Sequence, residues 1–263
     1  MNGWSNAAYK LESAISVDGK NLNKDAAARE KMKRAIVKYG AVTFSYNNVR
    51  EAYYYNPSKE SGSSPHACTI IGWDDTIPAE NFYPSKTTTD GGWLVKNSYS
   101  SLPYFYLSYE VTCEQIYAFD YVMNDKYDNN YFYDASATDS GIGSLLKIKQ
   151  AANVFKVKGD TENEWIKAVS VGIVGGNTDC TVEVYSDVQD GSFNPQNAKL
   201  ETTKTVYLEY GGFNCIELDK PVEVKKGSTF AVVVKVNNAY ITLSENEGES
   251  VSYTHLRAHE TSL

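Results

Sequence analysis

The run HACTIIGW at residues 66–73 decides how the first half of this chain folds. A second run, GWLVKNS at residues 92–98, has the same character, because apolar and β-branched side chains dominate both runs. Short runs of this composition predict β-strands. The first predicted strand begins at His66 and the second ends at Asn97, so the two strands carry a histidine and an asparagine at their ends.

A helix is predicted upstream of these strands. In residues 25–39 apolar side chains recur every three or four positions, with Asn23 or Asp25 in place as the N-cap and Gly40 as the C-cap. Two further strands are predicted at residues 41–46 and 104–109. A polar run with two prolines predicts a surface loop at residues 78–91.

The second half of the chain reads as all-β. From about residue 125 to 144 the sequence becomes rich in Asp, Asn and Tyr and then in Gly and Ser, which predicts a domain boundary near residue 125. After it come short β-rich runs separated by glycine-containing turns, with no helical pattern between them: 152–157, 165–174, 181–185, 203–210, 213–218 and 230–236. This spacing predicts an antiparallel β-sandwich over residues 125–250. The fold class is therefore α+β, a β-rich lobe followed by an all-β sandwich.

The last residues, 251–263, fit neither pattern. They resemble translated adapter sequence, so residues 251–263 are expected to be a non-native tail that carries no information on the fold. His255 and His259 stand at a spacing that can hold zinc, but they lie in this tail and the order of a zinc-protease motif is reversed. No metal and no cofactor are expected.

Composition narrows the function classes. The 263 residues include 25 Lys and Arg against 33 Asp and Glu, which gives a net charge of −8. The basic residues form no cluster that could bind along a phosphate backbone, so no nucleic acid partner is expected. No apolar run of about 18 residues occurs, which predicts no transmembrane segment, and residues 1–20 lack a secretory signal.

Two other groups of residues have an ordinary structural interpretation. The four cysteines are expected to be buried free thiols, in preference to a bridge between Cys180 and Cys215. Asp74 and Asp75, at the end of a predicted strand, are expected to form a solvated turn and not a catalytic or calcium-binding pair.

His66 and Asn97 suggest a specific chemistry. Amide hydrolysis through a thiol needs a thiolate, a base that takes and returns its proton, and a group that orients the base. His66 and Asn97, 31 residues apart, could supply the last two. Cys68 lies on the same strand face as His66, but a cysteine inside an apolar strand is more often packed than reactive.

Residues 30–110 resemble the C-terminal half of a papain-like cysteine peptidase. The motifs that carry the resemblance occur in the family's order at residues 40–44 (GAVTF), 66–73, 92–98 and 104–106 (YFY). The resemblance implies that His66 is the general base and acid, that Asn97 orients it, and that Val42 and Ala67 line the substrate pocket. It also implies a protein or peptide substrate and makes residues 1–124 the C-terminal part of a peptidase domain.

The chain departs from this family at three points. Tyr99 stands where the family has a tryptophan that shields the histidine and asparagine, so less cover is expected. The segment between Asn97 and Tyr104 is shorter than the family's glycine-rich loop. The nucleophile of such enzymes precedes the histidine by about 130 residues, which lies before Met1. The chain is thus expected to be a fragment that is inactive alone.

The second half is similar to the lectin-like domain that accompanies papain-like peptidases in some Gram-positive bacteria. That similarity implies an extracellular or cell-surface location and leaves a cell-surface glycan open as a partner. The alternative is a non-catalytic cell-surface binding or adhesion protein that uses the sandwich, with the peptidase-like half as a scaffold. A cysteine upstream, in a Gln-x-x-x-x-x-Cys-Trp context, would separate the two interpretations.

Overall fold

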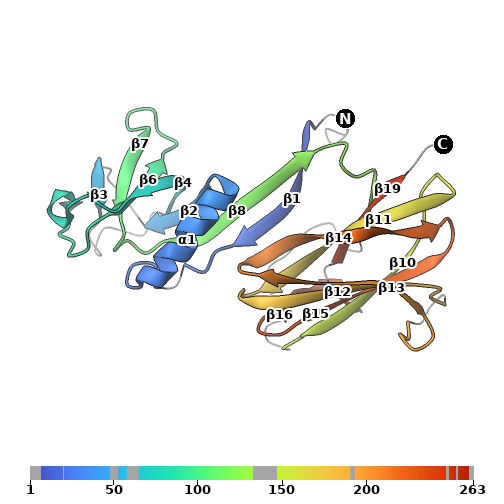
Figure 1. Cartoon of the computed structure of the whole chain (residues 1–263). Helices are drawn as coiled ribbons and strands as arrows, with labels where there is room; N and C mark the ends of the chain where they lie inside the picture. The colour runs from blue at the N-terminus through green and yellow to red at the C-terminus, as the bar shows by residue number, and fades with distance from the viewer. Residues whose placement is uncertain are drawn as a thin grey trace. The chain divides into compact units, whose positions relative to one another are not determined.

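The computed structural model describes residues 7–19, 21–47, 53–57, 65–132, 147–189, 193–246, 249–252 and 254–260 (Figure 1). Side chains are described up to residue 242. The chain divides into two compact units, one of Ser16–Asp120 and the other of Met1–Ile15 with Tyr121–Leu263. The first is called the histidine unit below and the second the sandwich unit.

The histidine unit is one twisted sheet with a helix on it. Its strands follow the order β5-β3-β7-β6-β4-β2-β8, and all described pairings are antiparallel except those that β3 makes with β5 and β7. Helix α1 packs against β4 and β2. The elements are α1 (Ala26–Tyr39), β2 (Val42–Asn47), β3 (Tyr54–Asn56), β4 (Pro65–Asp74), the 3-10 turn η2 (Ala79–Asn81), β5 (Tyr83–Pro84), β6 (Gly92–Lys96), β7 (Tyr104–Ser108) and β8 (Glu114–Met123).

The ends of α1 follow from local cap chemistry. The Asp25 carboxylate accepts a hydrogen bond from the backbone N–H of Ala27, which satisfies one of the free donors of the first turn. Gly40 ends the helix at a positive φ of 81°, and its N–H donates to the carbonyl of Ile36. The predicted helix and its predicted glycine cap are therefore confirmed, and of the two candidate N-caps Asp25 is the one used.

Strand alternation separates the two faces of the histidine sheet. In β2, Val42, Phe44 and Tyr46 are buried, whereas Thr43 and Ser45 are half-exposed. In the antiparallel register with β4 the three buried residues lie opposite Ile70, Cys68 and His66. The same face therefore carries apolar core residues at one end of β4 and His66 at the other.

The sandwich unit has two facing sheets (Figure 1). One has the order β10-β15-β12-β13, and in the other β14, β11, β19 and β9 follow one another, with β16 beside one end of β11. Val182, Val232 and Phe230 of the first sheet meet Val169 and Ile216 of the second in a continuous apolar core. The strands are β1 (Tyr9–Ser16), β9 (Asn129–Tyr131), β10 (Gln150–Lys156), β11 (Asn163–Val174), β12 (Thr178–Ser186), β13 (Lys199–Leu208), β14 (Gly211–Lys225), β15 (Thr229–Val236), β16 (Tyr240–Ile241), β17 (Leu243–Asn246), β18 (Glu249–Ser252) and β19 (Thr254–Glu260).

This architecture confirms the expected fold class, a β-rich lobe with one helix and an antiparallel sandwich. The unit boundary lies at Asp120, close to the predicted position near residue 125. The difference is at the N-terminus, where β1 belongs with the sandwich and not with the histidine unit. The reason is long-range: Ser13 Oγ accepts from the N–H of Cys215 at 3.0 Å, and Glu12 pairs with Lys126 at 2.7 Å.

The segment set aside as a tail takes part in the sheet. The backbone of β19 pairs with β11 over Thr254–Glu260 and with β9 through residues 256–258. The backbone of this segment is therefore part of the sheet, although its sequence fits neither pattern of the two halves. The non-native origin of its sequence is a separate matter and stays a prediction.

The cysteines are free thiols, as expected. Cys68, Cys113 and Cys180 are buried, and Cys215 is half-buried. Burial raises the pKa of the Cys113 and Cys180 thiols to about 12, so both are protonated and inert at neutral pH. In the part of the chain that the structure describes, no helix has the length and apolar character needed to cross a bilayer.

Candidate functional site

His66 and Asn97 meet at the end of the histidine sheet. His66 opens β4, and Asn97 directly follows β6, which pairs antiparallel with β4. Thr69 of β4 lies opposite Lys96, the last residue of β6, so Asn97, the residue after Lys96, falls within reach of His66. The imidazole Nε2 is 3.0 Å from Asn97 Oδ1. Two residues that are 31 positions apart in the sequence thus share a hydrogen bond.

The orientation of the Asn97 amide is set by its other partners. The N–H of Ser98 donates to Asn97 Oδ1 at 2.8 Å, and Asn97 Nδ2 donates to the carbonyl of Leu102 at 3.0 Å. A backbone N–H can only donate and a carbonyl can only accept, so the amide oxygen must face His66. His66 Nε2 must then carry the proton of this bond, and Nδ1 is the nitrogen of the neutral ring that can accept one.

Two aromatic rings enclose the imidazole. The Tyr99 ring stacks on His66 with centroids 5.1 Å apart and an angle of 8° between the planes. Tyr46 contacts the same ring edge-on at 5.7 Å. Tyr46 is 2% exposed, whereas Tyr99 is 55% exposed. Tyr99 therefore covers one face of the imidazole although it replaces a larger indole, and its outer side is open to solvent.

The two predicted pocket residues lie on opposite faces of the sheet. Ala67 is exposed beside His66. Val42 is 1% exposed and lies opposite Ile70, four residues along β4 from His66, and its place in a substrate pocket stays a prediction. The half-exposed residue directly opposite Ala67 is Ser45. Val42 shares the buried face of β2 with Phe44 and with Tyr46, which lies opposite His66.

Cys68 lies beside the pair but is closed off from solvent. It is 7% exposed, and its Sγ lies 3.5 Å from Asn97 Oδ1, at the length of a weak S–H hydrogen bond. Reactive cysteines sit in partly open, electropositive settings, and this one does not. Its burial favours the interpretation of Cys68 as packed, and the described part of the site holds a base and an orienting amide but no open thiol.

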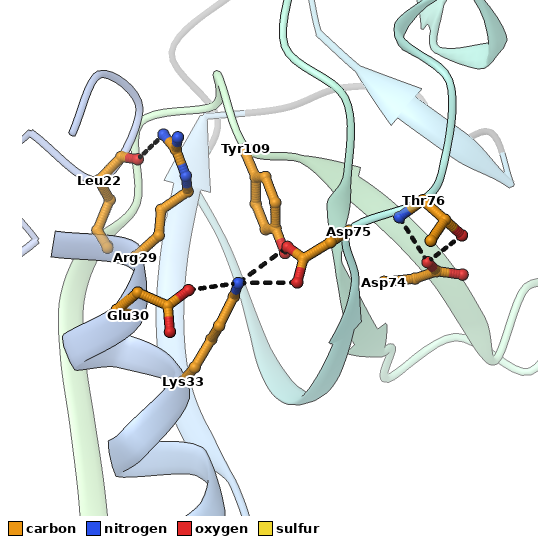
Figure 2. A network of polar contacts seen from close by, with 8 residues as sticks. All are labelled: Leu22, Arg29, Glu30, Lys33, Asp74, Asp75, Thr76 and Tyr109. Carbon is orange, nitrogen blue, oxygen red and sulfur yellow. Dashed lines mark hydrogen bonds and ion pairs between the residues drawn. The ribbon is translucent and has the colours of Figure 1, made fainter. Parts of the chain in front are cut away.

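A second polar cluster lies at the far end of β4 (Figure 2). Lys33 of α1 donates to both carboxylate oxygens of Asp75, at 2.8 and 3.0 Å, and to Glu30 at 2.7 Å. The Tyr109 hydroxyl donates to the same Asp75 carboxylate at 2.8 Å. Burial disfavours the charge on Asp75, but its hydrogen bonds with Lys33 and Tyr109 hold the pKa of the carboxyl below its usual value.

This cluster fastens α1 to the sheet. Asp75 follows β4 nine residues after His66, a separation of roughly 25–30 Å along an extended strand. Asp74 forms the expected solvated turn, since its Oδ1 accepts from the N–H and hydroxyl of Thr76 (Figure 2). The same expectation is wrong for Asp75, because an ion pair with a helix residue 42 positions earlier cannot be read from a local pattern. Among the described residues, no three His, Cys, Asp or Glu side chains converge to hold a metal ion.

Comparison with known proteins relates the two units to a solved architecture. Residues 131–259 match the family model of the lectin like domain. No curated protein matches the chain. The chain is similar to the crystal structure of the cysteine protease and lectin-like domains of Cwp84, a surface layer associated protein of Clostridium difficile, with 19% identity over 97% of this chain and a TM-score of 0.68.

A second structure gives the same picture. A variant of the clostridial cysteine protease Cwp84 after propeptide cleavage matches 99% of this chain at 19% identity, with a TM-score of 0.69. The chain spans 64% of the first structure's length and 74% of the second's. At this identity the likeness is one of fold, and it extends over both units of the chain.

Proposed function

We propose that this chain is the C-terminal part of the catalytic domain of a papain-like cysteine peptidase, followed by its lectin-like sandwich. The observation that carries the proposal is the hydrogen bond between His66 Nε2 and Asn97 Oδ1, in an amide that its bonds with Ser98 and Leu102 turn with the oxygen toward His66. The likeness in fold to the protease and lectin-like domains of Cwp84 supports it. The nucleophilic cysteine would lie upstream of residue 1.

The proposed roles follow from the geometry of the pair. With Nε2 engaged by Asn97, His66 would exchange a proton through Nδ1. The thiolate would attack the peptide carbonyl carbon, and the C–N bond would break as His66 gives its proton to the leaving amine. Water would then cleave the thioester, with His66 as the base. Asn97 would hold the ring throughout, and Ala67, exposed next to His66 in β4, would meet the substrate.

A cell-surface location belongs to the same proposal. The neighbour Cwp84 is described as a surface layer associated protein, and a lectin-like domain beside a peptidase suits an enzyme that works outside the cytoplasm. Its substrates would be proteins or peptides at that surface. Alone, without the nucleophile, this chain is expected to cleave nothing.

The test is to express the longest open reading frame that contains this chain and to treat it with a thiol-reactive peptidyl probe. We expect labelling of a cysteine upstream of residue 1, and we expect His66→Ala and Asn97→Ala to abolish or strongly slow it. His255→Ala is the matched control, a histidine outside this site, and should label like the parent. Labelling that does not depend on His66, or no labelled thiol in a folded product, contradicts the proposal.

We also propose that the sandwich binds glycan, through the outer face of the sheet β10-β15-β12-β13. Tyr207 is 62% exposed there, and its hydroxyl donates to Asn177 Oδ1 at 3.2 Å, so an open ring is held in one orientation. Thr181 and Thr205, whose hydroxyls share a hydrogen bond of 2.8 Å, lie next to it. A fixed ring beside hydroxyl groups suits stacking and hydrogen bonding to a sugar.

This second proposal is tested by co-sedimentation of the whole chain with purified Gram-positive cell-wall polysaccharide. Tyr207→Ala is expected to lower the bound fraction severalfold, because the stacking ring is lost. Tyr207→Phe keeps the ring and should retain most of the binding. Equal binding by the parent and Tyr207→Ala would exclude this face as the glycan site.

A further inference from the structure

The buried side of the His66 and Asn97 pair is closed by a thiol. Among the described residues, Asn97 Oδ1 receives three donors: His66 Nε2 at 3.0 Å, the N–H of Ser98 at 2.8 Å and Cys68 Sγ at 3.5 Å. His66 comes from the start of β4, and Cys68 stands two residues later on the same face of that strand. One strand therefore supplies both the ring that Asn97 orients and a second donor to the same oxygen.

The Cys68 thiol matters as a donor because both Cys68 and the Asn97 amide are buried. Asn97 is 8% exposed and Cys68 is 7% exposed, so little water reaches this side of the amide. Without the Cys68 thiol the oxygen would keep His66 Nε2 and the N–H of Ser98, but it would lose the donor on its buried side, one of the contacts that hold the amide in this orientation. The only side-chain group of Cys68 that can donate is its S–H, and it points at the oxygen that holds His66.

We propose that Cys68 is a positioning residue, whose thiol proton helps to keep the Asn97 amide turned toward His66. The inference rests on the proposed function for its catalytic meaning, but the geometry that it concerns exists in this chain as it stands. It assigns Cys68 neither a nucleophilic nor a merely space-filling role. Its sulfur acts on His66 only through Asn97.

Packing and hydrogen bonding make opposite predictions for two substitutions. Cys68→Val removes the donor and fills at least the volume of the thiol, whereas Cys68→Ser keeps a donor and loses volume. If the thiol acts by hydrogen bonding, the serine variant should preserve the site and the valine variant should loosen it. If the thiol only fills space, the order is reversed.

The experiment uses the whole chain with ¹⁵N-labelled histidine and asparagine and measures how fast the His66 Nε2 proton and the Asn97 side-chain amide protons exchange with water. His66→Gln identifies the His66 signals among the three histidines. We expect Cys68→Val to speed both exchanges severalfold, up to about tenfold, since one neutral hydrogen bond shifts an opening equilibrium by about that much. Cys68→Ser should exchange at the parent rate or more slowly.

Cys113→Val is the matched control. Cys113 is a second buried thiol of the same unit, and its Sγ donates to the carbonyl of Val111 at 3.7 Å, not to the Asn97 amide. Its substitution should leave the His66 and Asn97 signals unchanged. Parent-like exchange in Cys68→Val, or faster exchange in Cys68→Ser than in Cys68→Val, overturns the proposal. These readouts need no catalysis, so a failed probe-labelling experiment would not be confused with a failure here.

Discussion

The Asn97 amide contacts one group that can only donate a hydrogen bond and one that can only accept. A substitution that replaces its NH₂ group by an oxygen therefore tests how the amide is oriented. In Asn97→Asp, an oxygen replaces the Nδ2 group that donates to the Leu102 carbonyl at 3.0 Å, so two acceptors face each other. The position is 8% exposed, so water cannot easily compensate. We expect a loss of about 1–3 kcal/mol in the free energy of unfolding, measured by urea titration.

Asn97→Ser is the comparison for that prediction. It removes the amide but places no second acceptor against the Leu102 carbonyl. If Asn97→Asp were as stable as the parent near neutral pH, the amide would have to be turned the other way, and the assignment of the proton to His66 Nε2 would be wrong.

The attachment of α1 to β4 depends on an ion pair whose two side chains differ in their exposure to solvent. The Lys33 side chain is 11% exposed, whereas that of Asp75 is 56% exposed. Asp75→Ala should therefore cost more stability, about 1–3 kcal/mol, because it leaves a largely buried ammonium with Glu30 as its remaining acidic partner. Lys33→Met should cost about 0–1 kcal/mol, since the freed carboxylate can turn to water and the methionine still packs. Equal losses in thermal or urea unfolding would contradict this asymmetry.

A carboxylate also fixes the loop between β4 and β6. Glu110 Oε1 accepts from the N–H and hydroxyl of Thr88 and from the N–H of Thr89, at 2.8, 2.8 and 3.0 Å. Burial opposes the charge, but these bonds dominate and lower the pKa of Glu110 to about 2, from an ordinary 4.5. A lowered folded-state pKa contributes stability above pH 4.5 that is lost as the pH falls toward 2.

The pH dependence of the Glu110 contribution can be measured by urea unfolding at several pH values. Because the group is partly exposed, we expect the parent to lose about 1 kcal/mol through this residue between pH 4.5 and 2. Glu110→Gln should remove that part of the pH dependence and should be less stable than the parent at neutral pH. Glu114→Gln, at an exposed acid of the same unit, is the control and should keep the parent's pH profile.

The elements that the sequence predicts well are those whose causes are local. The N-cap and C-cap of α1 depend on Asp25, Gly40 and their near neighbours, and the strands at His66 and Asn97 depend on runs of a few residues. What the sequence did not predict depends on distant partners, as with the ion pair of Lys33 and Asp75 and the assignment of β1 to the sandwich unit. The pocket role of Val42 comes from the family resemblance alone and stays a prediction, with Val42 on the buried face of β2.

At the scale of the whole molecule, the family match and the candidate site fall in different parts of the chain. The lectin-like match covers residues 131–259 and contains neither His66 nor Asn97. The candidate site lies wholly in the histidine unit, which also exposes large aromatic side chains, among them Tyr53, Tyr83 and Tyr104. The sandwich unit exposes large aromatic side chains too, among them Tyr121 and Tyr207, so such groups favour association of the chain through either unit.

Each unit has its own buried core, so the two are expected to unfold in separate transitions. Ile70 in the histidine unit and Ile166 in the sandwich unit are both 0% exposed, which makes them a matched pair. Ile70→Ala and Ile166→Ala should each cost about 2–5 kcal/mol, and each should lower the midpoint of one transition while the other stays in place. Calorimetry of the whole chain checks this. A single transition that both substitutions lower would mean that the units unfold together, and a folded, monomeric parent with one sharp transition would also count against the histidine unit being part of a larger catalytic domain.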